Sequence, residues 1–486
     1  MPLKAKIQFP GMAGKANIAT EAAQIPRELP GDAKDDVLFT PLFGVRHVEL
    51  NRPKKLNSLD ASMVRKITPR LLEYENSELA NVIVVSGAGG KAFCAGGDVA
   101  ALAVGIKEKG EEGQKLAKEF FELEYQLDHL IANYTKPYIA VLDGYTMGGG
   151  VGMSVHAPFR IATEKTKFAM PETKIGFFPD VGASFFLSRL DGSLGTYLAL
   201  TSETLSAEEV FYAGIATHYF PSSSLPALIQ RLSELVFHDR ASFDERLEIV
   251  NKTMAEFHTG FPDDEGKPSV VRGSLRNSVD RCFSKQSVSE IIEALKNETE
   301  NVEWAQNTLK TLSERSPTSL KVALRQMIIG KSWSIRTAFQ REQKISSKFM
   351  EHPDFVSGVW SLLVDKLKSG APKWQPPTLD DVTDADVDKF FDVPPGESLM
   401  PVLKPGVDYH EYPHKHFALP SEEDIKKVVQ DTGYPKEDIV KYFWNSTGRK
   451  AGVKNKVAEV LDRRTKAGPR GRLEWVEITG DATANL

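Results

Sequence analysis

The stretch 136–157 reads "KPYIAVLDGYTMGGGVGMSVHA". Its first part is an apolar run containing β-branched and aromatic residues, which is typical of a buried strand. Three consecutive glycines, Gly148 to Gly150, end this strand, and a run that can form a helix follows. The order of strand, glycine turn and helix predicts an α/β unit.

The same order recurs on the N-terminal side. In "FGVRHVELNRP" (43–53) the residue types alternate as in a strand, which is predicted to end at Pro53. "NVIVVSGAGG" (81–90) is an apolar run, predicted to be a strand that ends at glycines. We therefore expect repeated α/β units from about Val37 to Phe220. From about Thr201 to Lys368 apolar residues recur at helical spacing, which predicts a helical region.

The chain has 486 residues, which is too long for one ordinary core. We expect a spiral core over 37–240, a helical domain over 241–377, and a linker with a helical extension over 378–486. Residues 372–395 are rich in proline and are predicted to be that linker. The remaining segment, 1–36, is predicted to be an N-terminal arm, equally compatible with a transit segment and with an arm of no function.

Composition narrows the class of protein. Hydrophobic residues make up 41% of the chain, which is normal for a globular protein. The net charge of −5 gives no overall electrostatic attraction to nucleic acid or anionic membrane. Cys94 and Cys282 are the only cysteines, which indicates a reducing compartment and excludes a cysteine-based zinc site.

Two glycine-rich turns precede helices, "FCAGGD" (93–98) and "MGGGVG" (147–152). A turn at a helix start presents free N–H groups, and two such turns could direct two N–H groups at one oxygen. That arrangement is an oxyanion hole, suited to a carbonyl that gains negative charge. For either turn taken alone, an ordinary tight turn is the favoured interpretation, because short glycine motifs match by chance, and neither turn spells the dinucleotide-binding G-x-G-x-x-G.

Two acids lie in an apolar setting in "MPETKIGFFPDVG" (170–182), namely Glu172 and Asp180. A carboxylate removed from water is costly unless it is paired, neutralised or used. A third acid, Glu124, shares a helical stripe with Phe120, Leu127 and Ile131 and is predicted to face inward. The alternative for Glu124 is a structural pair with a lysine such as Lys136.

Several motifs taken together resemble a known family: "NRPKKLNSL", "FCAGGD", "TMGGGVG", "FAMPETKIGFFPDVG", "SPTSLKVALRQM" and "DFVSGVWSLLVDK". They are similar to the 3-hydroxyisobutyryl-CoA hydrolases, a branch of the enoyl-CoA hydratase/isomerase (crotonase) superfamily. The resemblance implies a spiral of ββα turns followed by a helical domain. It also implies a mitochondrial acyl-CoA thioester hydrolase of valine catabolism that needs no cofactor, since CoA is part of the substrate.

The resemblance also implies roles for particular residues. Glu172 would attack the thioester carbonyl or activate water, and Asp180 would orient the substrate or water and assist proton transfer. The N–H groups of Gly97 and Gly149 would form the oxyanion hole. The remaining substrate contacts implied by the resemblance are Glu124, Lys55, Leu56, Ala95 and Asp98.

A rival chemistry is hydration of an enoyl-CoA. Hydratases of the superfamily use a second glutamate just after the glycine turn, where this chain has Gly152. The chain also departs from the hydrolase branch at Ser357-Gly358 and Trp360, where the family usually has glutamate–glycine and an arginine. This departure weakens any transfer of CoA-phosphate contacts to that segment.

Two features near the C-terminus suggest other functions. "HEYPHKH" (410–416) contains the H-E-x-x-H of zinc proteases, but Pro413 disfavours the helix that this motif needs, so we expect no metal site. The segment Arg449 to Arg472 holds nine basic and two acidic residues. Relatives of these hydrolases occur in the small subunit of the mitochondrial ribosome, so this tail is either an RNA contact or a solvated helix face.

Overall fold

The computed structural model describes residues 22–258, 260, 268–367, 370–394, 396–468 and 472–478. Residues 1–21 of the predicted N-terminal arm lie outside these ranges, so the transit-segment hypothesis falls outside the described residues. None of the helices in the described ranges combines the length and apolarity needed to cross a membrane.

Two sheets form the centre of the fold. The six-stranded sheet has the order β1 (Val37–Leu42), β2 (Val45–Leu50), β3 (Val82–Gly87), β5 (Tyr138–Leu142), β7 (Phe159–Ala162) and β10 (His218–Tyr219). The four-stranded sheet has the order β4 (Ala92–Cys94), β6 (Tyr145–Met147), β8 (Lys167–Ala169) and β9 (Leu205–Ser206). Successive strands from β3 to β8 alternate between the sheets. This alternation confirms the predicted spiral of ββα turns.

One predicted strand is two strands in the structure. The run over 136–150 divides at Asp143-Gly144 into β5 and β6, which belong to different sheets. Gly144 has a φ of +108°, and a Cβ atom added there would lie 2.2 Å from the carbonyl oxygen of Lys91. The backbone can therefore pass from one sheet to the other only through a glycine at this point.

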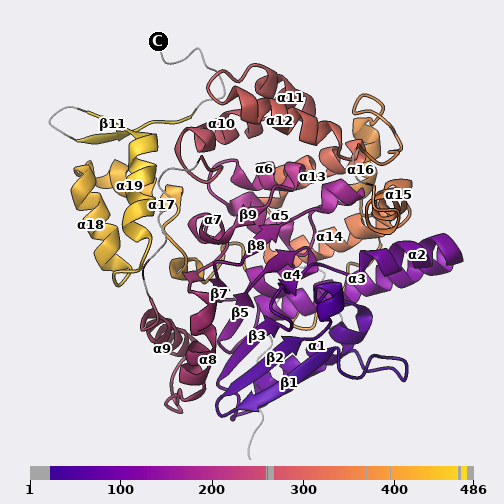
Figure 1. The fold of residues 1–486 in the computed structure, drawn as a ribbon, viewed down its shortest axis with the longest axis horizontal. Helices are drawn as coiled ribbons and strands as arrows, with labels where there is room; N and C mark the ends of the chain where they lie inside the picture. Colours follow the sequence, from indigo (N-terminus) through magenta and orange to yellow (C-terminus); the bar gives the residue numbers. More distant parts are fainter. Residues whose placement is uncertain are drawn as a thin grey trace, which may run out of the picture.

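Helices cover the sheets on both sides of the spiral (Figure 1). The spiral itself carries α1 (Ala61–Asn76), α2 (Val99–Lys109), α3 (Glu111–Ala132), α4 (Gly149–Val155), α5 (Ala183–Phe186), α6 (Leu194–Thr201) and α7 (Ala207–Tyr212). The predicted helical region contains α8 (Leu225–Ser233), α9 (Phe243–Ala255), α10 (Gly273–Phe283), α11 (Val288–Lys296), α12 (Val302–Ser313), α13 (Pro317–Gly330), α14 (Ile335–Phe349) and α15 (Pro353–Val359). Ser316 caps α13 by accepting from the Ser319 N–H.

The predicted linker over 372–395 is packed rather than free. It contains α16 (Asp384–Phe391), which begins with a capping box formed by Thr383 and Asp386. Val387 and Phe390 of this helix are buried against the main apolar cluster. The linker prediction is therefore wrong for this segment, because two buried side chains hold it on the core. The domain boundaries at 240 and 377 remain predictions.

The chain ends in a C-terminal extension, which we define as three helices and a hairpin. These are α17 (Glu422–Thr432), α18 (Lys436–Ser446), α19 (Val453–Arg464), β11 (Thr465–Ala467) and β12 (Leu473–Trp475). The helices were expected and the hairpin was not. Ion pairs fasten the extension to the core, with Lys456 Nζ 2.9 Å from Asp191 Oδ2.

Candidate active site

The fold brings the two glycine turns together. Strands β4 and β6 pair in parallel, with Cys94 opposite Thr146, so the turns that follow them emerge at the same edge of the sheet. A Cβ atom added at Gly96 would lie 3.5 Å from the carbonyl oxygen of Met147 and 3.9 Å from the amide nitrogen of Gly149. The predicted juxtaposition of the turns is present.

The amides of Gly97 and Gly149 are both unused by the protein. Among the described residues, neither N–H donates a hydrogen bond, although neighbouring amides do: Asp98 N donates to Leu59 O at 2.7 Å and Val151 N to Gly148 O at 2.7 Å. Gly149 is also the first residue of α4, where the helix dipole favours negative charge. Gly149 is buried and Gly97 is partly buried. An amide removed from water without an acceptor is costly, and a ligand oxygen would satisfy both N–H groups.

The two acids of the 170–182 segment are both buried. Glu172 begins a 3-10 helix (Glu172–Ile175), and its Oε2 has no hydrogen-bond partner among the described residues. Its Oε1 lies 3.0 Å from the position of a Cβ atom added at Gly148. Asp180 accepts a hydrogen bond of 2.6 Å from the Tyr125 hydroxyl. Glu172 therefore lies beside the glycine turn, and Asp180 is held by α3.

Glu124 faces inward, as its place on the helical stripe predicts. It is 1% exposed, and its Oε1 lies 2.1 Å from the position of a Cβ atom added at Gly149. The alternative, a pair with Lys136, is wrong. Lys136 Nζ instead donates to the carbonyl oxygens of Ala80, at 2.7 Å, and of Ser77.

A fourth acid, Asp128, was missed in the sequence. Both of its carboxyl oxygens are buried without a hydrogen-bond partner among the described residues. A Cβ atom added at Gly152 would lie 2.3 Å from Asp128 Oδ2. The space next to Gly152, where hydratases carry a glutamate, is thus filled by the carboxyl group of Asp128. Asp128 lies four residues after Glu124, and that spacing on one helix face was the available signal.

These carboxyl groups hold protons tightly. Burial, followed by the nearby charge of Asp180, raises the pKa of Glu172 and of Glu124 well above the usual range. Burial raises the pKa of Asp180 to about 7, against the lowering effect of the Tyr125 hydrogen bond. Burial and the charge of Glu124 also raise the pKa of Asp128. No cation pairs with them among the described residues, so burial and mutual repulsion disfavour the charged forms of the four acids.

The predicted CoA-contacting residues also lie together. Ala95 N donates to Leu56 O at 3.0 Å, which joins the 54–59 segment to the first glycine turn. Lys55 Nζ and Arg52 lie 2.6 Å and 2.8 Å from Asp98 Oδ2. Burial favours a higher pKa for Asp98, but the hydrogen bonds from Lys55 and Arg52 prevail and lower it. Asp98 therefore forms ion pairs with both Lys55 and Arg52 and holds them in place.

The segment that departs from the family lies next to Glu172. A Cβ atom added at Gly358 would lie 2.4 Å from the carbonyl oxygen of Ile175, so only glycine fits against that turn. Lys107 Nζ lies 3.4 Å from the ring centroid of Trp360. Trp360 occupies the position where the family usually has an arginine, and it makes a cation–π contact with Lys107 instead.

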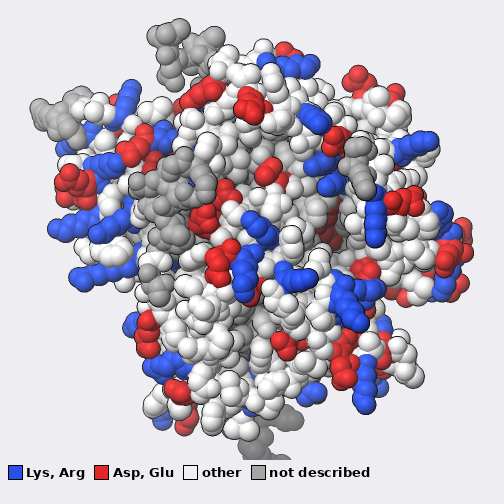
Figure 2. Space-filling view, in the orientation of Figure 1, with Lys and Arg blue, Asp and Glu red and all other residues white. Residues whose placement is uncertain are grey.

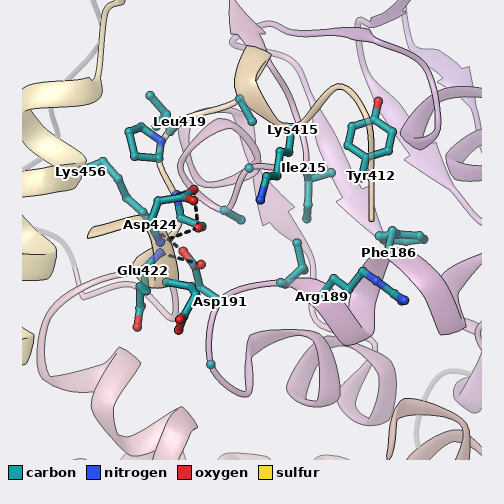
Figure 3. Close-up of a pocket in the computed structure, with 18 of the residues that line it drawn as sticks. Phe186, Arg189, Asp191, Ile215, Tyr412, Lys415, Leu419, Glu422, Asp424 and Lys456 are labelled. Carbon is teal, nitrogen blue, oxygen red and sulfur yellow. Dashed lines mark hydrogen bonds and ion pairs between the residues drawn. The ribbon is translucent and has the colours of Figure 1, made fainter. Parts of the chain in front are cut away.

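A cavity of about 490 Å³ lies away from the four acids, between the spiral and the extension. Figure 3 shows Lys456, Asp191 and Glu422 on one side of it, and Phe186 with Tyr412 on the other. The H-E-x-x-H segment contributes Glu411 and Tyr412 to this lining. Residues 410–414 do not form an α-helix, so the histidines do not share a helix face.

Comparison with known families gives one broad match. The enoyl-CoA hydratase/isomerase family matches residues 45–391, which include both glycine turns and all four acids. A solved carnitinyl-CoA dehydratase from Mycobacterium thermoresistibile is 33% identical with a TM-score of 0.65, and covers 75% of this chain and 98% of its own.

Two kinds of curated relative differ in how much of the chain they match. The 3-hydroxyisobutyryl-CoA hydrolase, mitochondrial, of Homo sapiens is 41% identical over 74% of this chain and 89% of its own length. The small ribosomal subunit protein mS47 of Neurospora crassa is 50% identical over 95% of this chain and 91% of its own length.

Proposed function

Because the chain belongs to the enoyl-CoA hydratase/isomerase family, we propose that it hydrolyses the thioester of a short branched hydroxyacyl-CoA, with 3-hydroxyisobutyryl-CoA as substrate. The products are 3-hydroxyisobutyrate and CoA. The observation that carries the proposal is that, among the described residues, Glu172 Oε2 has no hydrogen-bond partner and the amides of Gly97 and Gly149 donate to no acceptor, with Glu172 Oε1 next to the second glycine turn. The mitochondrial hydrolase relatives support the same activity and a mitochondrial location.

In this mechanism the thioester oxygen accepts hydrogen bonds from Gly97 and Gly149. Either the Glu172 carboxylate attacks the carbonyl carbon, or it takes a proton from a water that attacks. Negative charge on the oxygen then rises, and the two amides stabilise it. The C–S bond breaks and the CoA sulfur takes up a proton. If water attacks directly, its oxygen enters the product carboxylate. If Glu172 attacks, an acyl-enzyme anhydride forms, and water then hydrolyses it to release the product acid and restore the Glu172 carboxylate.

The pKa of Glu172 is itself raised by burial, so its carboxyl group must lose a proton before it reacts. Burial also disfavours the charged forms of Glu124 and Asp128, so a charged Glu172 has few competing charges and little solvent around it and is a reactive nucleophile or base. Asp180, whose pKa is raised to about 7 by burial, can hold or release a proton near neutral pH. We assign it to orienting the substrate hydroxyl or the water and to proton transfer.

The first prediction concerns the reaction type. The purified protein is expected to release free CoA thiol from 3-hydroxyisobutyryl-CoA. It is expected to leave crotonyl-CoA largely unhydrated, because position 152 is a glycine where hydratases have a glutamate. A thiol-reactive dye measures the first reaction, and loss of enoyl absorbance measures the second. Efficient hydration without thiol release would refute the hydrolase assignment.

The second prediction concerns the hydrogen bond between Tyr125 and Asp180. This bond favours the charged carboxylate, so Tyr125→Phe should raise the pKa of Asp180 further above about 7. The limb of the pH profile of kcat/KM that reports Asp180 is then expected to move to higher pH. Tyr134→Phe is the matched control, because its hydroxyl donates to Leu71 O away from the acids. A limb that stays in place or moves to lower pH would contradict the assigned role of Asp180.

A second function is supported by the extent of one match. The ribosomal relative spans 95% of this chain, whereas the human hydrolase spans 74%. The difference is about a fifth of the chain, similar in size to residues 392–486, which follow the family match and include the C-terminal extension. We therefore also propose that the protein associates with the small subunit of the mitochondrial ribosome. The two functions are compatible, because the four acids lie in the spiral and the extension lies outside it.

A further inference from the structure

A groove of about 1020 Å³ separates the extension from helix α9. Its walls are α9 with His258 on the core side, and α17, α18 and the loop 447–451 on the extension side. The connecting segment 415–420 also lines it. Figure 1 shows α9 and α18 facing each other across this region, and Figure 2 shows Lys and Arg side chains gathered over the extension at the left of the view.

The lining of the groove is rich in unpaired cations. Five of its residues are basic and have no carboxylate partner within the described part of the chain: Lys252, Lys415, Lys427, Arg449 and Lys450. Three acids also line it, and two of them are engaged. Glu248 lies 3.8 Å from His416, and Asp424 accepts from the Ser421 hydroxyl at 2.6 Å. Five basic side chains against three carboxylates leave the groove with a small excess of positive charge.

Lys450 lies deepest in this set. Its Nζ is 3.5 Å from Nε2 of His218, whose ring stacks on His258 at 6.0 Å. Burial and the charge of Arg160 lower the pKa of Lys450 to about 7. A buried ammonium group without a counter-ion is unfavourable, and an anion in the groove would compensate it.

The groove also offers surfaces for bases. Tyr442 is 52% exposed and Trp444 also lines the groove, followed by the polar side chains of Asn445, Ser446 and Thr447. A positively charged groove with aromatic side chains is the usual site for single-stranded nucleic acid, because phosphates meet cations and bases stack on rings.

The basic segment Arg449 to Arg472 is not a uniform nucleic-acid surface. Lys456 is paired with Asp191 at 2.9 Å, and Arg463 with Glu422 at 2.5 Å. Arg464 lies 3.3 Å from Glu477. These cations fasten the extension to the core or to itself. Of the described basic residues of this segment, Arg449 and Lys450 line the groove.

We propose that this groove binds single-stranded RNA, with phosphates against Lys252, Lys427 and Arg449 and a base stacked on Tyr442. The inference rests on the proposed ribosomal association and assigns its contact surface. It places RNA binding away from the four acids, so one chain can carry both functions.

The test compares two triple variants. Lys252→Glu/Lys427→Glu/Arg449→Glu reverses the exposed cations of the groove. Lys310→Glu/Lys331→Glu/Lys373→Glu is the control, with the same charge change at exposed lysines outside the groove. Binding of a fluorescein-labelled single-stranded RNA is measured by anisotropy at several salt concentrations. Thiol release from 3-hydroxyisobutyryl-CoA and circular dichroism establish that each variant is folded.

The groove variant is expected to bind RNA at least about tenfold more weakly than the control, and its salt slope should fall by ~0.7 for each lost phosphate contact. Tyr442→Ala should weaken binding by about tenfold at an unchanged salt slope, because stacking carries no charge. Equal binding by the two triple variants would overturn the proposal. So would failure of the parent protein to bind the RNA at all.

Co-sedimentation with purified mitochondrial small subunits separates this inference from the ribosomal function. If the parent protein does not co-sediment, the ribosomal function fails. If the parent and the groove variant co-sediment equally, the association stands and uses a protein contact, and the groove proposal is wrong. Loss of co-sedimentation in the groove variant alone is the result we expect.

Discussion

Glu172→Gln is expected to reduce thioester hydrolysis by about 10²- to 10⁴-fold while substrate binding survives. The amide keeps the size of the side chain and removes both the nucleophile and the base. Because the Glu172 carboxyl group is buried and its pKa is raised by burial, a neutral amide should fit its place without loss of stability. Single-turnover release of CoA thiol measures the effect.

Glu122→Gln is the matched control for this variant. Glu122 lies on the same helix as Glu124 and its pKa is also raised by burial, but it is half-buried beside Gln126, away from Glu172. It should retain the parent rate. Near-normal turnover by Glu172→Gln would mean that another of the four acids carries the reaction.

Replacing the Gly149 amide by an ester is expected to slow hydrolysis by about a hundredfold, which corresponds to ~3 kcal/mol of lost oxyanion stabilisation. The change, introduced by incorporating glycolic acid, removes one N–H and adds no side chain. Gly149→Ala would not be a clean test, because its Cβ atom would lie 2.1 Å from Glu124 Oε1.

An ester at Val151 is the control for Gly149. The Val151 N–H donates to Gly148 O at 2.7 Å, so this change removes a hydrogen bond of the α4 turn and leaves the unused amides in place. It should affect thermal stability more than rate. If the Gly149 ester folds normally and hydrolyses substrate at the parent rate, Gly149 is an ordinary turn residue and the oxyanion assignment fails.

Much of the fold could be predicted from the sequence because its signals are local. Apolar runs ended by glycines marked β3 and the 136–150 region. The break at Gly144 was not predicted, because it depends on the close approach of Lys91 from a neighbouring turn. A contact between distant segments leaves no periodic pattern in the sequence.

Helix α16 was missed for a different reason. Its capping box, Thr383 to Asp386, was present in the sequence, but the surrounding prolines favoured a linker. The acids of the site also divide into those with a local sequence signal and one that depends on a contact between distant segments. Glu172, Asp180 and Glu124 were found from motifs and helical spacing, whereas Asp128 appeared only when α3 was placed against Gly152.

The fate of the oxygen of water tests the central claim most directly. The protein is incubated with 3-hydroxyisobutyryl-CoA in water enriched in heavy oxygen, and the products are analysed by mass spectrometry. Hydrolysis predicts free CoA and one heavy oxygen in the carboxyl group of the released acid. Heavy oxygen in the hydroxyl group of a product that is still a CoA thioester, with no free thiol, would contradict hydrolysis and indicate hydratase chemistry.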